Sequence, residues 1–230
     1  MKRIIYLFFL LFLFSTYDVS SAPCYGTKMP SKYQWFWGTE VNYIFKRNLE
    51  ANQGKFRSAQ CFLTASFGLT DWLCIDAAAG QGFVKYNPSQ IEEIDYDSAF
   101  AGKYGFRIKF FESENLPLSS VFGFQHISVH PHHNVINNIK RRVIFDDWQL
   151  SLLLSYDGMN RFFPYIGGKV SRGDLIEWYN DSRKRRKSED SQSLGLVCGF
   201  NFFFTRDFWL NLEGRLFDEK AASLGINYAF

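Results

Sequence analysis

Hydrophobic and polar positions alternate with a period of two along most of this chain. In residues 100–110, Phe, Tyr, Ile and Gly at even positions alternate with Ala, Lys, Arg and Gly at odd positions. Because successive side chains of a β-strand point to opposite faces, the pattern predicts strands with one apolar and one polar or small face. The same alternation predicts strands at residues 35–45, 59–69, 72–86, 100–110, 118–129, 147–157, 162–171, 193–202, 208–216 and 221–230.

The connections between these strands alternate in length. Tight turns at residues 70–71, 158–160 and 205–207 fall at one end of the predicted sheet, and long polar loops at 48–55, 87–97, 130–145 and 172–191 fall at the other. About ten strands of roughly 9–11 residues, joined by short turns on one side and long loops on the other, are typical of a transmembrane barrel. We predict an all-β, closed antiparallel transmembrane β-barrel of about ten strands. Eight strands and an exported, soluble β-sandwich are the alternatives.

The N-terminus changes the expected location of the chain. A basic start is followed by an apolar run at residues 4–14 and by small residues up to Ala22, which is the pattern of a cleaved secretory signal peptide. The apolar run is too short for a membrane-spanning helix. We therefore expect a signal peptide at residues 1–22 and one barrel domain at residues 23–230. Aromatic residues make up 19% of the chain, yet its mean hydropathy is −0.19, which favours alternating strands over a conventional buried core.

The four cysteines, Cys24, Cys61, Cys74 and Cys198, lack the CxxC spacing of metal sites. The predicted alternation places Cys61 and Cys198 on one face of the sheet and Cys74 on the other. We therefore expect few or no disulfides.

The last predicted strand carries Tyr228 and Phe230 on its apolar face. This resembles the C-terminal signature of bacterial outer-membrane β-barrels, in which a terminal aromatic residue serves as an assembly signal. The whole mature chain resembles the small outer-membrane barrels of the OmpA and OmpX type. The resemblance implies location in the outer membrane of a Gram-negative bacterium. It also implies the barrel assembly machinery, periplasmic chaperones, outer-membrane lipids and lipopolysaccharide as partners, and neither nucleic acid nor a cofactor.

The predicted polar face carries charges of both signs. In a narrow barrel these side chains meet, so we expect a lumenal network of ion pairs that fills the interior. The default function is therefore a structural or surface-binding role without enzymatic activity, and a narrow polar pore is an alternative. The expected lumenal residues are Glu40, Asp76, Lys103, Arg107, Lys109, Asp147, Asp157, Lys169, Glu213 and Arg215.

All four histidines lie between His126 and His133. One interpretation is a polar strand end that runs into an exposed loop. A second is a surface site for a divalent transition metal, since clustered imidazoles can chelate such ions. No acidic residue of obvious ligand spacing accompanies them, so we expect no metal site.

A third interpretation concerns His126 and Ser128, which lie two apart on one strand and hence on the same face. An imidazole there can deprotonate the hydroxyl. The pair resembles the His-x-Ser of outer-membrane phospholipases and lipid A deacylases, and implies an alternative function as a lipid hydrolase. Those families usually have Asn after the Ser, where this chain has Val129. Asp146, Asn137 and Asn138 are the candidates for the orienting third residue.

Basic residues gather in the predicted loops. The loop at residues 172–191 contains Arg183, Lys184, Arg185, Arg186 and Lys187, and residues 140–142 are also basic. On the outer side of the membrane these side chains would meet the phosphates of lipopolysaccharide. The alternative is a solvated charged loop.

Overall fold

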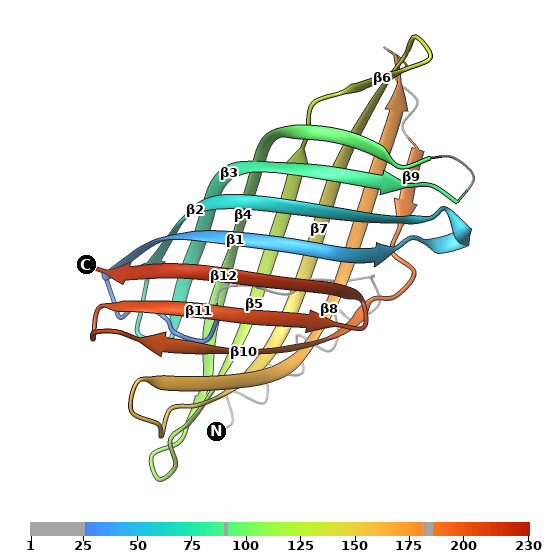
Figure 1. The fold of residues 1–230 in the computed structure, drawn as a ribbon. Helices are drawn as coiled ribbons and strands as arrows, with labels where there is room; N and C mark the ends of the chain where they lie inside the picture. Colours follow the sequence, from blue (N-terminus) through green and yellow to red (C-terminus); the bar gives the residue numbers. More distant parts are fainter. Residues whose placement is uncertain (1–25, 90–91, 181, 183–185) are drawn as a thin grey trace.

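A computed structural model describes residues 26–89, 92–180, 182 and 186–230 (Figure 1). The predicted signal peptide, Cys24 and residues 183–185 of the basic loop lie outside the described residues. No helix in the described part of the chain is long and apolar enough to cross a membrane. The elements are β1 (Trp35–Asn48), the short 3-10 helix η1 (Glu50–Asn52), β2 (Lys55–Gly68), β3 (Leu73–Asn87), β4 (Ile94–Glu112), β5 (Leu118–His130), β6 (Asn134–Ile136), β7 (Ile139–Tyr156), β8 (Phe162–Tyr179), β9 (Arg186–Glu189), β10 (Leu194–Phe203), β11 (Phe208–Leu216) and β12 (Glu219–Ala229).

The strands form one closed antiparallel barrel. Each long strand pairs with the next along the chain, β7 pairs with β8, and β12 returns to pair with β1, with Val41 opposite Leu224. Short β6 and β9 are added to β7 and β8 and take no part in closure. The barrel therefore has ten strands, as predicted. The eight-stranded alternative is excluded because residues 35–45 and 118–129 both belong to strands of the barrel.

The barrel wall has an apolar outside and a charged inside. Trp37 and Leu63 face outward and are 51% and 69% exposed, whereas Arg107 and Asn201 face inward and are 1% exposed. This is the reverse of a soluble protein, in which charged groups lie at the surface. A closed sheet with this wall is the form in which strands cross a bilayer, because no sheet edge is left unpaired in lipid. The soluble sandwich is thereby excluded.

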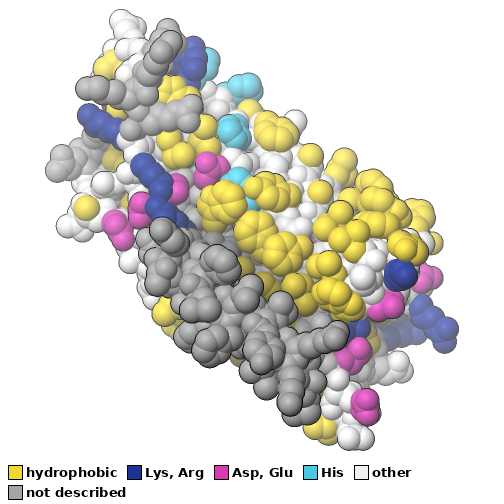
Figure 2. Space-filling model, turned by 180° about the vertical axis from the view of Figure 1, so that it is seen from behind, with side chains coloured by type: hydrophobic (Ala, Val, Ile, Leu, Met, Phe, Trp, Pro, Cys, Tyr) yellow, Lys and Arg dark blue, Asp and Glu magenta, His cyan; other side chains and the backbone are white. Residues whose placement is uncertain are grey.

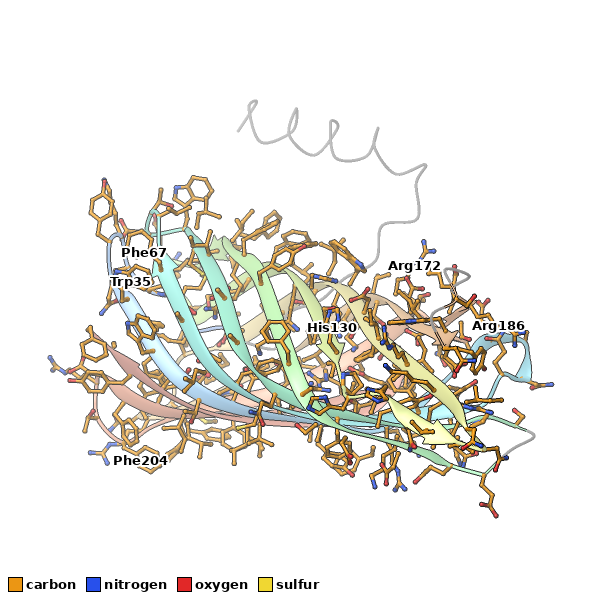
Figure 3. All side chains as sticks on the ribbon, turned by 90° about the horizontal axis from the view of Figure 1, so that it is seen from above. Trp35, Phe67, His130, Arg172, Arg186 and Phe204 are labelled. Carbon is orange, nitrogen blue, oxygen red and sulfur yellow. The ribbon has the colours of Figure 1, made fainter. Side chains whose placement is uncertain are left out.

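Aromatic side chains mark the end of the barrel where the tight turns lie. Figure 3 shows Trp35, Phe67 and Phe204 at this end and Arg172 and Arg186 at the opposite end. The turn end is rich in exposed aromatic residues, as expected at a membrane interface. They are Tyr33, Trp35, Trp37, Trp72, Phe110, Phe111, Phe204, Phe208, Tyr228 and Phe230.

At the end opposite the tight turns, the barrel is longer than the sequence predicted. The predicted loop 130–145 contains β6 and the beginning of β7, residues 139–145. The predicted loop 172–191 contains the end of β8 and all of β9. Here the alternation is inverted. Val143, Phe145 and Leu175 face inward and are 2% exposed or less. The basic side chains of Arg172 and Lys187 are 33% and 40% exposed. Outside the membrane the wall meets water, so the apolar face turns to the interior and the pattern no longer indicates a membrane strand.

A bulge in β1 changes the face of the wall on which Arg47 lies. The register of β1 with both its neighbours shifts after Ile44. Phe45 and Lys46 are both exposed, and Arg47 faces the lumen. A bulge inserts one extra residue and so reverses the alternation beyond it.

Candidate functional site

Arg47 organises the ion pairs in the outer half of the lumen. Its guanidinium is completely buried, lies 2.8 Å from Asp147 and 3.4 Å from Glu219, and also pairs with Asp190. It donates a further hydrogen bond to Ser171 Oγ at 2.9 Å. These partners come from β7, β8, β12 and the segment after β9. One side chain therefore ties together strands from opposite parts of the wall.

A second cation, Lys169, continues the network. Its Nζ lies 2.6 Å from Glu219 and 2.8 Å from Asp218. Arg215 is 3.0 Å from Glu219 and 3.7 Å from Glu213, and Tyr165 donates a hydrogen bond of 2.9 Å to Glu213. All of these groups are buried.

The inner half of the lumen holds smaller groups. Lys103 pairs with Glu40 at 2.6 Å, and Arg107 pairs with Asp76 at 2.8 Å. Arg107 also donates to the backbone carbonyl oxygens of Lys28 and Gly26, at 2.7 and 3.3 Å. Residues 26–29, which precede β1, therefore lie inside the barrel at its turn end.

Two of the expected lumenal residues lie elsewhere. Lys109 pairs at 3.1 Å with Glu112, and both side chains are at least 30% exposed. Asp157 lies beyond the end of β7, where it accepts hydrogen bonds from Ser119 and Ser155. Both residues belong to the turn end of the barrel rather than to the buried groups.

The prediction missed four central members of the network. Arg47 was missed because the bulge reverses its side. Asp218 and Glu219 fall between the predicted strands 208–216 and 221–230, and Asp190 falls in the predicted loop 172–191. Glu219 is the first residue of β12 and Asp218 immediately precedes it, so both carboxylates face into the barrel. A charged pair at the start of an alternating strand was the available signal.

The lumen leaves little free space. A cavity of about 20 Å³ lies in the inner half, lined by Lys28, Glu40, Ser66, Arg107, Trp209 and Asn227 among others. A cavity of this size holds about one water molecule. The ion pairs and residues 26–29 fill the space around it.

A different group of polar side chains lies on the outer wall. We define the outer-wall cluster as His126, Ser128 and His130 on β5 and Asp146 on β7. Ser128 lies directly opposite Asp146 in the sheet. Ser128 Oγ donates a hydrogen bond to Asp146 Oδ1 and lies 2.8 Å from His130 Nε2. His126 Nε2 is 3.7 Å from Asp146 Oδ1.

The structure thus brings His126, Ser128 and Asp146 together and adds His130. The even positions of β5 face outward, so His126 and Ser128 lie on the outer wall. The imidazole at hydrogen-bond distance from Ser128 is that of His130, while Asp146 lies between Ser128 and His126. The prediction ended this strand at Val129 and so left His130 in a loop. Asn137 and Asn138, the other candidates for a third residue, lie in the turn after β6, away from the pairing of β5 with β7.

Aromatic rings enclose His126. Its ring stacks on Trp148 with a centroid distance of 4.0 Å, and Tyr104 approaches edge-on at 5.1 Å. Ser128 lies between Asp146 on one side and Gly102 on the other, and the ring of Phe100 on β4 lies beside Gly102. Figure 2 shows the histidines at the edge of the hydrophobic belt, with charged side chains nearby.

The cluster lies at the height of a membrane interface. Asp146 and Tyr156 are ten residues apart on β7. At about 3.3 Å per residue and a tilt of about 40°, this corresponds to roughly 25 Å along the barrel axis, which equals the height of the apolar band of such barrels.

The described part of the basic loop is paired with acidic residues. Lys187 lies 2.9 Å from Asp174 and 3.3 Å from Glu189, and Arg172 lies 2.8 Å from Glu189. The hydrogen bond from Lys187 lowers the pKa of Glu189. Arg186 lies over the ring of Tyr179.

Two further features concern metal and sulfur chemistry. Among the described residues, no group of three or more His, Cys, Asp or Glu side chains is arranged to hold a metal ion. Cys61 and Cys198 are exposed and Cys74 is buried, as the alternation predicted, and all three are free thiols.

No protein-family model and no curated protein sequence matches this chain. Similar solved structures include the transport unit of the autotransporter AIDA-I from Escherichia coli, with 10% identity over 91% of this chain and 93% of that chain and a TM-score of 0.46. The outer membrane protease OmpT from Escherichia coli has 12% identity over 89% and 99% of the two chains and a TM-score of 0.40. The translocator domain of the autotransporter NalP from Neisseria meningitidis has 9% identity over 87% and 88% and a TM-score of 0.45. None of these similarities carries a function over to this chain. Its closed sheet, apolar outer wall and buried charges are those of an outer-membrane β-barrel protein.

Proposed function

We propose that the protein is an outer-membrane hydrolase that cleaves ester-linked acyl chains of outer-leaflet lipids, with Ser128 as the nucleophile. The observation that carries this proposal is the contact of 2.8 Å between Ser128 Oγ and His130 Nε2 on the outer wall. A serine is a weak nucleophile unless an adjacent base removes its proton.

In the proposed reaction, the Ser128 hydroxyl first turns its proton from Asp146 Oδ1 toward an unprotonated His130 Nε2. The proton then passes to His130 Nε2 while Oγ forms a bond to the acyl carbonyl carbon. The ester C–O bond breaks, and the alcohol leaves with the proton that His130 held. A water molecule then attacks the acyl group and gives a proton to His130. The fatty acid leaves, and Ser128 Oγ regains its proton from His130. Before the reaction Asp146 accepts the hydrogen bond from Ser128, and it lies 3.7 Å from His126 Nε2, so it positions the side chains of the cluster.

The position of the cluster supports access to lipid. The cluster faces outward at the outer edge of the apolar band, where the ester groups of outer-leaflet lipids lie. Gly102 carries no side chain beside Ser128, so the neighbour on the β4 side is the ring of Phe100, 3.2 Å from where a Cβ of residue 102 would lie. Phe100 is an exposed side chain, so a lipid can approach Ser128 from the β4 side if this ring moves aside.

The test measures release of fatty acid by mass spectrometry from vesicles of phospholipid and of lipopolysaccharide that contain the refolded protein. Ser128→Ala abolishes release, and His130→Ala lowers it by about 10²–10⁴-fold, the usual contribution of a general base. Thr39→Ala is the matched control, because Thr39 is an exposed side chain on β1, away from the cluster. A fluorophosphonate probe labels the wild type and the control but not the Ser128 variant. Equal release from wild type and Ser128→Ala contradicts the proposal.

A structural or surface-binding role without enzymatic activity is the second candidate. The lumen supports it, because buried ion pairs and residues 26–29 occupy its interior in the described part of the chain, beside a cavity of about 20 Å³. This role predicts silence in planar bilayers, whereas a narrow pore predicts steady single-channel conductance. Unchanged lipids in the hydrolysis assay, together with a silent bilayer, favour this second candidate.

Surface binding by the basic loop is also a proposal. Replacing residues 183–187 by Gln lowers co-purification with lipopolysaccharide if the loop binds its phosphates, and unchanged co-purification contradicts this.

We further propose that Tyr228 and Phe230, whose rings contact edge-to-face at 4.7 Å, serve as the signal to the barrel assembly machinery. We also propose that the protein is related to the OmpA- and OmpX-like barrels, because its barrel is small and side chains fill the lumen.

A further inference from the structure

Five cationic side chains gather on the outer wall of β12, β1, β2 and β3, at the end opposite the tight turns. They are Lys46, Lys55, Arg57, Lys85 and Lys220. Lys46 lies opposite Lys220 in the sheet, and Arg57 lies opposite Lys85. Like charges directly opposite each other on neighbouring strands destabilise a sheet. This arrangement therefore has a cost in the protein alone.

A depression of about 310 Å³ lies within this group of cations. We call it the basic groove. It forms where the bulge of β1 leaves Phe45 and Lys46 without register partners on β2. Its walls are Phe45, Lys46, Lys55, Phe56, Arg57, Lys85, Asn87 and Glu93.

The acidic side chains that pair with these cations do not balance them. Arg57 pairs with Glu93, and Lys85 pairs with Asp95. These four side chains are 31–54% exposed, so a ligand can reach them. Lys46, Lys55 and Lys220 form no ion pair with a described residue. The groove therefore carries a net positive charge that an anion can bind.

Aromatic rings lie directly below the cations on the membrane side. Tyr43 and Phe45 contact at 4.7 Å, and Phe83 lies 6.5 Å from Tyr43. Lys85 Nζ lies 5.8 Å from the centre of the Phe83 ring. A ligand that fits this wall has an anionic head at the level of the lysines and apolar chains at the level of the rings.

We propose that the basic groove binds the phosphorylated headgroup of an outer-leaflet lipid, whose acyl chains lie against Tyr43, Phe45 and Phe83. Phosphate suits both the guanidinium fork of Arg57 and the point charges of the lysines. The site is independent of the proposed hydrolase. The groove lies on the wall nearest the viewer in Figure 1, where β1, β2, β3 and β12 lie side by side. The histidines lie on the opposite side of the barrel, which Figure 2 shows.

The test measures lipid retention by native mass spectrometry of the refolded full chain in detergent. The probes are bisphosphorylated lipid A, its monophosphorylated form, phosphatidylcholine and inorganic phosphate. We expect bisphosphorylated lipid A to be retained most, its monophosphorylated form less and phosphatidylcholine least. We also expect retention to fall as salt is added. Lys46→Gln combined with Lys55→Gln weakens retention of bisphosphorylated lipid A by about tenfold to thirtyfold, from the attraction of each cation near an anionic surface. Lys32→Gln combined with Lys109→Gln removes the same charge at the turn end and leaves retention unchanged.

Three results overturn the proposal. One is equal retention of bisphosphorylated lipid A and phosphatidylcholine by the wild type. Another is equal loss in the groove variant and the turn-end control. The third is displacement of lipid A by millimolar inorganic phosphate, which would make the groove a site for free phosphate. Because the first and third results need only the wild type, a variant that fails to refold does not affect them.

Discussion

Replacing Arg47 by methionine tests whether the buried ion network holds the barrel together. Methionine has a similar length but no charge. The change removes the contacts with Asp147 at 2.8 Å and Glu219 at 3.4 Å, the pair with Asp190 and the hydrogen bond to Ser171. It leaves carboxylates buried with fewer partners. Glu219 keeps Lys169 and Arg215, but Asp147 and Asp190 lose their cation.

The magnitude follows from this loss. Removing one partner of a buried ion pair costs about 3–5 kcal/mol, because the remaining charge stays out of water. A loss of about 4 kcal/mol lowers the folding equilibrium constant roughly a thousandfold. Arg57 provides the matched control, since its pair with Glu93 lies on the outside with side chains 44% and 32% exposed. Arg57→Met costs about 0–1 kcal/mol.

The assay is urea-induced unfolding in lipid vesicles at pH 8, followed by tryptophan fluorescence and by the mobility shift of folded barrels on gels. A double variant, Arg47→Met with Asp147→Leu, removes both members of one pair. It loses less stability than Arg47→Met alone if the cost comes from the uncompensated carboxylate. If Arg47→Met and Arg57→Met lose the same small amount, the lumenal network does not determine the stability of the barrel.

Two further predictions concern Asp190 and Gly102. Burial raises the pKa of Asp190 from 3.8 to about 7, so the folded chain keeps this proton to higher pH than the unfolded chain, and stability falls as pH rises from about 4 to about 7. Asp190→Asn resembles the protonated form and flattens this part of the profile of unfolding free energy against pH; identical profiles would refute the assignment. Gly102→Leu places a side chain beside Ser128 and lowers lipid hydrolysis at least about tenfold, through lost positioning of the substrate, while the unfolding midpoint stays within the range of ordinary surface changes. Full hydrolysis by Gly102→Leu would mean that the lipid approaches from another side.

The membrane-spanning half of the fold could be predicted because lipid imposes one rule on every strand. Each outward residue must be apolar, and each inward residue is then free to be polar. Residues 100–108 follow this rule, and Lys103 and Arg107 lie in the lumen as the alternation requires, whereas Lys109 next to the register shift of β4 does not. The count of ten strands follows from the same pattern repeated along the chain.

The parts that escaped prediction lie where this rule ends. Beyond the membrane the wall meets water, so Phe145 and Leu175 turn inward and the pattern changes phase. A single bulge reverses the side of Arg47. Neither change leaves a local signal, because the inversion depends on where the membrane stops and the bulge depends on how β1 pairs with β2 and β12. The outer-wall cluster was predicted in part, from the spacing of His126 and Ser128, while the role of His130 depended on one more residue of strand.

The inversion of polarity along the wall has a consequence for how deep the protein sits in its membrane. Above Asp146 the outer surface carries charged side chains, and apolar residues such as Phe145 and Leu175 lie inside beside the buried ion pairs. This section is unfavourable in lipid, because its charged exterior would meet hydrocarbon. The level at which the wall changes polarity therefore fixes the depth of the barrel in the membrane.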